Sequence, residues 1–287
     1  MDPVRKIADA VLYEGYILWP YRRSALKNAR RFTFGTLEPG ETMRTEVLLE
    51  DGDPAAVDVT VRFLQAVRRQ LYRVGEPVDE LVVDGERHLS WEEATERQLS
   101  VSGTGRFPIV IEAGRAEERL SGDGVIVRSW DGLEGEVSVG AEPLRPGLRR
   151  VSVVIANGSP EGGMLHSTHT ILRARSGAFV SSLDPEAEEA CSNEGTWPVL
   201  VGEPGDRRTM LSSAIILEEY PRVAPESPGD LFDGGEIDQL LTLNILGLTD
   251  AEKAEMRASD PRAREILERT ESLTPAELMR LHGVMRP

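Results

Sequence analysis

The sequence predicts an α+β protein: a β-rich antiparallel core, either a sandwich or barrel-like, with an N-terminal helix and a C-terminal helical appendage. Through the middle of the chain, apolar and polar residues alternate with period two, and turns containing Gly, Asn or Asp interrupt the alternation. At both ends, helix caps precede apolar residues at helical spacing. These patterns divide the chain into three predicted regions, 1–35, 36–224 and 225–287.

The N-terminal region opens with a predicted helix. Asp2 is a good N-cap residue, and Pro3 then occupies the first helical position, where its missing N–H costs nothing. Apolar residues recur at helical spacing from Ile7 to Leu12, and Gly15 is a typical C-terminal stop.

The central region predicts short strands separated by tight turns. Residues 57–63 place Val and Phe on one face and Asp, Thr and Arg on the other, the pattern of a half-buried strand. Residues 64–74 fit either a continued strand or a helix, because their apolar residues suit both periods. The other predicted strands are 45–50, 80–83, 98–102, 108–112, 125–129, 136–139, 150–156, 168–174, 178–182 and 210–219.

The C-terminal region predicts helices with explicit caps. Capping boxes occur at 249–252 and 274–277, and Asp260 followed by Pro261 starts a helix between them. An earlier helix covers 236–246. Its predicted apolar stripe comprises Ile237, Leu240, Leu241 and Ile245. Each stripe is narrow, so we expect these helices to lie on another surface rather than form a core of their own.

Composition limits the classes of function. The 287 residues carry a net charge of −16, which makes nucleic acid and anionic membranes poor partners for the whole chain. No apolar run is long enough for a transmembrane helix and no signal peptide is recognisable, so we expect a soluble cytoplasmic protein. One cysteine, Cys191, excludes an internal disulfide and a cysteine-only metal site.

Residues 1–35 differ from the rest because they carry seven bases against three acids. Such a basic patch could bind an acidic peptide, a phosphate or the chain's own acidic surface.

The same region holds four large aromatic residues between positions 13 and 21. Aromatic and Arg residues dominate interface hot spots, which makes the segment a predicted protein-binding surface. The alternatives are that it packs on the β core, with its Arg residues paired internally, or that it stacks on nucleic-acid bases. The candidate partner-binding residues are Tyr16, Trp19, Tyr21, Arg22, Arg23 and Lys27.

Motifs for catalysis, nucleotide binding or metal binding are mostly absent. The chain has no P-loop, no dinucleotide-binding glycine motif and no nucleophile elbow, and we expect no cofactor, no metal and no catalytic residue. His166 and His169 are the only neighbouring histidines, and a separation of three on a continuous strand places them on opposite faces. A turn could still bring them together, with Asp184 or Glu161 as a third metal ligand.

Cys191 is the one thiol that could act as a nucleophile. The acidic residues around Cys191 are expected to raise its thiol pKa, which disfavours a nucleophile. The alternative to a protein-binding function is an enzyme or a small-ligand-binding protein. Its site would lie near His166 and His169, and Asp184 and Asn193 could contribute to it.

Four stretches resemble an uncharacterised bacterial family encoded beside uptake nickel–iron hydrogenase structural and maturation genes, notably in actinobacteria. They are residues 13–28, 31–35, 223–233 and 248–253. The resemblance spans the chain and implies a hydrogenase accessory or assembly role, with hydrogenase subunits as candidate partners. The chain departs from the known metal-insertion factors because it lacks a cysteine pair, a His-rich tract and a nucleotide-binding loop. We therefore expect a non-catalytic accessory protein that binds a protein partner.

Overall fold

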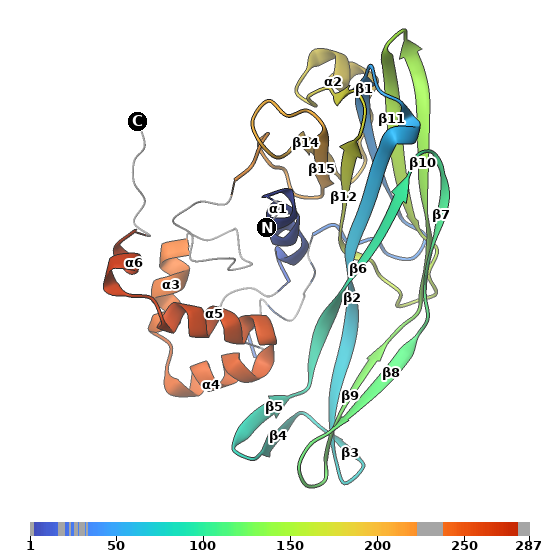
Figure 1. The fold of residues 1–287 in the computed structure, drawn as a ribbon. Helices are drawn as coiled ribbons and strands as arrows, with labels where there is room; N and C mark the ends of the chain where they lie inside the picture. The colour runs from blue at the N-terminus through green and yellow to red at the C-terminus, as the bar shows by residue number, and fades with distance from the viewer. Residues whose placement is uncertain are drawn as a thin grey trace.

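Two antiparallel β-sheets packed face to face form the centre of the protein in the computed structural model (Figure 1). Helices lie at the N-terminal and C-terminal ends of the chain, which confirms the predicted α+β fold with a β-rich sandwich core. The structure describes residues 3–16, 21, 22, 24, 25, 28, 32, 34–222 and 238–280.

Each sheet combines strands from distant parts of the sequence. The first sheet has the order β13 (Ala178–Phe179), β1 (Thr42–Glu50), β11 (Leu148–Asn157), β10 (Leu133–Arg145) and β7 (Gly105–Ile111). The second has the order β14 (Trp197–Leu200), β15 (Thr209–Ser213), β12 (His166–Ala174), β2 (Val57–Arg73), β9 (Gly124–Trp130) and β8 (Gly114–Arg119). Two further strands of this sheet, β3 (Glu76–Val78) and β6 (Trp91–Ser102), also pair with β2. A hairpin of β4 (Glu80–Val83) and β5 (Glu86–Leu89) stands apart from both.

Strand β2 forms the long axis of the molecule (Figure 1). One of its edges pairs first with β12 and then with β9, while the other pairs with β6 and then with β3. Residues 64–73 are therefore strand, which settles the choice that the sequence left open. The neighbouring strands on both edges supply the backbone hydrogen bonds that a helix would otherwise have provided.

The main core lies between the two sheets. The inward face of β2 from Val57 to Phe63 belongs to the same buried apolar cluster as the inward face of β11 from Val151 to Ile155. This is the period-two pattern that predicted the sandwich, and each buried side chain of this kind stabilises the fold by about 1.5–3 kcal/mol.

Some elements differ from the sequence prediction. The predicted strand 210–219 ends at Ser213, and no strand was predicted for β3, β5, β8 or β14. Strand β8 is a polar edge strand whose residues are almost all exposed, so it shows no apolar alternation. The short helix α2 (Pro185–Ala190) was also not predicted, although Asp184 caps it and Pro185 opens it.

The N-terminal helix α1 (Pro3–Tyr13) packs on the outer face of the second sheet. Its residues Val4, Ala8 and Val11 share an apolar cluster with Ile171 of β12 and Leu211 of β15. Gly15 has a φ of +72°, the left-handed conformation expected of a residue that ends a helix.

The C-terminal helices lie beside the lower half of β2 and β6, close to the β4–β5 hairpin (Figure 1). They are α3 (Asp238–Leu246), α4 (Asp250–Ser259), α5 (Pro261–Glu271) and α6 (Pro275–Arg280). The predicted caps are present: Thr249 and Glu252 form a reciprocal capping box, and Asp260 accepts from the Arg262 backbone N–H. None of the described helices is long and apolar enough to span a membrane.

The predicted stripe of α3 is only partly correct. Leu241 and Ile245 are buried, whereas Leu240 is 49 % exposed, and Ile237 lies outside the described residues. The helix is apolar on more than one face, so its sequence could not show which face packs inward.

Candidate functional site

The aromatic-basic segment is the stretch of residues 13–31 that holds the aromatic and basic side chains noted in the sequence. Those of its residues that the structure describes lie at the junction between the β core and the C-terminal helices. Tyr16 and Tyr21 are 1 % and 0 % exposed. They belong to a buried group, here called the junction cluster, made of Leu12, Tyr13, Tyr16, Tyr21, Phe32, Leu64, Trp91, Leu241, Ile245, Met256, Ala263, Ile266 and Leu267. Neither tyrosine ring is open to a partner in this arrangement.

The contacts of these predicted partner-binding residues are within the chain. The Tyr16 hydroxyl donates to Asp260 Oδ2 at 2.7 Å, and Arg22 Nη1 lies 2.9 Å from Glu252 Oε1. Trp19, Arg23 and Lys27 lie outside the described residues, and a partner-binding role for them stays a prediction.

A polar network surrounds the junction cluster. The Tyr13 hydroxyl donates to Glu96 Oε1 at 2.5 Å and also accepts from Arg262 Nη2. Arg62, whose side chain is 1 % exposed, lies 2.6 Å from Asp9 and 3.3 Å from Glu96. Burial alone would raise the pKa of Glu96, but the Tyr13 hydrogen bond and the neighbouring arginines hold it below its usual value. The network ties α1, β2, β6 and α5 together.

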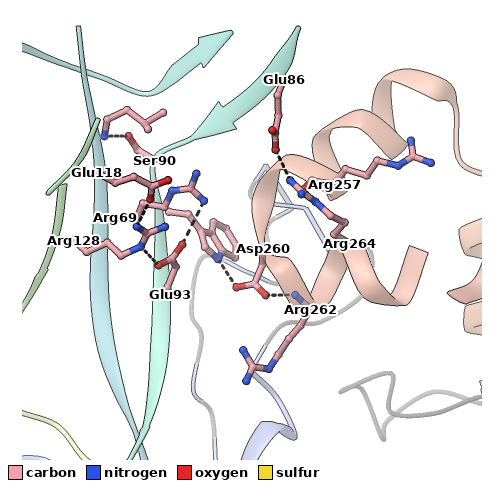
Figure 2. A network of polar contacts seen from close by, with 12 residues as sticks. Arg69, Glu86, Ser90, Glu93, Glu118, Arg128, Arg257, Asp260, Arg262 and Arg264 are labelled. Carbon is pink, nitrogen blue, oxygen red and sulfur yellow. Dashed lines mark hydrogen bonds and ion pairs between the residues drawn. The ribbon is translucent and has the colours of Figure 1, made fainter. Parts of the chain in front are cut away.

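Figure 2 shows the charged contacts that flank the junction on its sheet side and its helix side. Glu93 lies 3.4 Å from Arg69 and 2.8 Å from Arg128, joining β6 to β2 and β9. Asp260 accepts from the indole N–H of Trp91 at 3.3 Å while it caps α5. The Glu93 contacts therefore join three strands to one another, and the Asp260 contact holds the start of α5 against β6.

The predicted histidine pair sits at a β-bulge. His166 is opposite Leu64 and His169 is opposite Arg62, so two residues of β12, Ser167 and Thr168, lie opposite the single residue Phe63 of β2. Ser167 lies within the bulge and has a φ of +51°. The bulge returns both histidines to one face of the sheet, which corrects the placement expected for a continuous strand.

The two rings nevertheless have different neighbours. His166 stacks on Phe32 with ring centroids 4.2 Å apart, and its Nδ1 lies 3.1 Å from Thr36 Oγ1. His169 is fully buried and its Nδ1 donates to the Ser167 carbonyl at 3.0 Å. Burial is the main reason that the pKa of His169 falls to about 4, and the charge on Arg62 adds to the effect.

The remaining residues of the alternative site are engaged elsewhere. Asp184 accepts from the Glu186 backbone N–H at the start of α2, and Asn193 accepts from the Glu46 backbone N–H at 2.8 Å. In the part of the chain that the structure describes, no group of three or more His, Cys, Asp or Glu side chains is placed to hold a metal ion.

Cys191 lies beside α2 and packs against a small apolar cluster. Burial raises the pKa of its thiol to about 11, and the Glu46 carboxylate contributes to the rise. The thiol is therefore protonated at neutral pH, and a protonated thiol is a poor nucleophile. The direction of the shift is the one predicted, but its causes are burial and the sequence-distant Glu46 rather than the acidic residues next to Cys191 in the sequence.

An apolar groove opens between α2 and the edge strand β14 and has a volume of about 260 Å³. Leu48, Val180 and Ala187 form its buried floor, where α2 packs on the first sheet. Its rim carries Leu183, Trp197 and Ile216, which are 77 %, 47 % and 72 % exposed. Three large apolar side chains at one opening form the kind of exposed patch that marks binding sites on soluble proteins.

Sequence reasoning missed this groove. Its rim residues come from three segments that are distant in sequence and none belongs to a predicted motif. The isolated Trp197 was the available signal, but Trp side chains are largely buried on average, so a lone Trp in a sequence does not indicate an exposed site. Only the meeting of the two sheet edges under α2 places these side chains together.

Comparisons with protein-family models, curated proteins and solved structures found no match for this chain.

Proposed function

We propose that this chain is a non-catalytic accessory protein that binds a protein partner through the apolar groove, and that the partner belongs to a nickel–iron hydrogenase system. The observation that carries the proposal is the rim of Leu183, Trp197 and Ile216 around a groove with a buried apolar floor. Large apolar and aromatic side chains that are desolvated on binding supply most of the affinity of protein interfaces.

The shape of the site supports a protein partner. Small-molecule sites usually enclose about 300–1,000 Å³ and bury most of the ligand. At about 260 Å³ the groove is near the lower end of that range, and its most exposed residues lie at its rim. This arrangement suits one side chain of a partner in the groove, with the partner's surface resting on the rim.

The chemical groups near the groove support a role without catalysis. The Cys191 thiol is protonated at neutral pH because its pKa is raised to about 11, and Asn193 is held by the Glu46 backbone. The hydrogenase context comes from the resemblance of residues 13–28, 31–35, 223–233 and 248–253 to the hydrogenase-linked family.

The proposal can be tested with purified hydrogenase large and small subunits. Immobilised chain should bind one of them, and Leu183→Glu or Ile216→Glu should weaken binding by about 30-fold, equivalent to about 2 kcal/mol. Both side chains are exposed, so the substitutions should leave the fold intact. Val110→Glu, at a 69 % exposed position on β7, is the matched control and should bind normally. Binding that is unchanged in both groove variants, or absent for both subunits, would refute the proposal.

A further inference from the structure

The charge around the groove is strongly one-sided. Residues 181–201 contain five acids and no Lys or Arg. Two of these acids are neutralised locally, since Glu186 lies 2.9 Å from Arg145 and Glu194 lies 3.7 Å from Arg44. Arg150, which donates to the Ala190 carbonyl at the end of α2, is also paired within the chain, since it lies 2.5 Å from Glu142 and 3.9 Å from Glu46.

Three exposed acidic residues, one that lines the groove and two that directly follow lining residues in the sequence, have no such partner. Glu188 lines the groove, and Glu189 is the next residue of α2. Glu218 follows Leu217, which also lines the groove. Among the described residues, none of the three forms an ion pair. An apolar opening flanked by unpaired acids favours a ligand that combines an apolar group with positive charge.

A second copy of this chain is a poor occupant by the same reasoning. A symmetric dimer through the groove would bring the acidic patch of one copy, with Glu188 and Glu218, against the same acidic patch of the other copy. Each copy also carries a net charge of −16, which opposes association.

We infer that the groove recognises a basic amphipathic segment of the partner, an inference that rests on the proposed function. One large apolar side chain of that segment would lie on the groove floor, and its Lys or Arg residues would lie against Glu188, Glu189 and Glu218. The apolar contact supplies affinity and the charges supply selection and speed of association. Binding of this kind weakens as salt increases, because exposed charges are screened.

The test uses three labelled helical peptides and fluorescence anisotropy with the full chain. One peptide is built from Leu and Lys, the second from Leu and Glu, and the third from Ser and Lys. The Leu–Lys peptide should bind at least about tenfold more tightly than either of the others. Its affinity should fall several-fold between about 50 and about 300 mM salt.

Two triple variants locate the effect. Glu188→Lys with Glu189→Lys and Glu218→Lys should weaken binding of the Leu–Lys peptide by at least about tenfold. The control triple, Glu76→Lys with Glu112→Lys and Asp123→Lys, makes the same change in net charge at three exposed positions on or beside β3, β8 and β9, and it should have little effect. Leu183→Ser with Ile216→Ser should weaken binding without altering charge.

Equal effects of the two triple variants, or equal binding of the Leu–Glu peptide, would overturn the inference. So would self-association in sedimentation that Ile216→Ser abolishes, because a second copy would then be the occupant. If a hydrogenase subunit needs Leu183 and Ile216 but tolerates the groove charge reversal, the inference fails and the proposed function stands. If the peptide results hold but no hydrogenase subunit binds, the hydrogenase partner fails and the inference stands.

Discussion

Arg62 and His169 share an unusual environment, because both are polar side chains facing α1 from the buried surface of the second sheet. Arg62 is paired with Asp9 and Glu96, which offsets much of the cost of burying its charge. His169 has no acidic partner among its described contacts, and its Nε2 is buried without a hydrogen bond. A proton on His169 would therefore add a second positive charge beside Arg62.

This environment predicts a pH-dependent stability. The pKa of His169 is about 4 in the folded protein, against 6.5 as its ordinary value. Between these values the unfolded chain takes up a proton that the folded chain excludes, so folding is less favourable as the pH falls. The free energy of unfolding should drop by about 3 kcal/mol from about pH 7 to pH 4 because of this group.

Denaturant unfolding of the wild type and His169→Gln at several pH values would measure the effect. The difference in unfolding free energy between the two proteins should change by about 3 kcal/mol across that pH range. Carboxylates that titrate below pH 5 affect both proteins and cancel in the difference. Two curves that run parallel from pH 7 to pH 4 would contradict the prediction.

At the scale of elements, two helices begin with the same sequence signal but have different tertiary roles. Asp184 caps α2 and Asp260 caps α5, each followed by proline. Asp184 is exposed, whereas Asp260 is 2 % exposed and also accepts from Tyr16 and Trp91. The second cap therefore joins the helix to the junction cluster.

Replacing each cap by alanine should separate these roles. Asp184→Ala removes a surface cap and should cost about 1 kcal/mol of stability. Asp260→Ala should cost about 3 kcal/mol or more, because it also leaves the buried donors of Tyr16 and Trp91 without their acceptor. Thermal or denaturant unfolding measures both, and equal losses would show that the buried contacts of Asp260 contribute nothing.

At the scale of the whole molecule, the C-terminal helices complete a core rather than forming one alone. The junction cluster takes residues from the N-terminal segment, from β2 and β6, and from α3, α4 and α5. Each helix contributes only a few buried side chains, as its narrow stripe predicted. The sheet surface around Leu64 and Trp91 is buried only when all of these parts are present.

A chain that ends at Arg222 should therefore be destabilised. Removing the helices exposes the apolar surface at Leu64 and Trp91, where each large side chain is worth about 1.5–3 kcal/mol. We expect unfolding at a lower denaturant concentration and increased binding of a hydrophobic dye. Unchanged unfolding of the β core, with no added dye binding, would show that the appendage is an independent unit.

Local sequence patterns correctly predicted the fold class, most strands between 45 and 174, and the starts of α1, α4, α5 and α6. These features are local, because period-two alternation and cap residues act within a few positions of one another. The sequence could not decide between strand and helix at 64–74, nor which face of α3 packs inward. In both places more than one face is apolar, and the choice depends on which neighbours are present.

The candidate site was decided only by tertiary structure. The aromatic-basic segment had the strongest local signal, yet Tyr16 and Tyr21 are used to join the helices to the sheet. The groove has a weak local signal because Leu183, Trp197 and Ile216 are unremarkable in their own segments. The exposure of a side chain depends on how the whole molecule packs. The residue type shows that a side chain has apolar area to bury, but it does not show whether the chain itself or a partner covers that area.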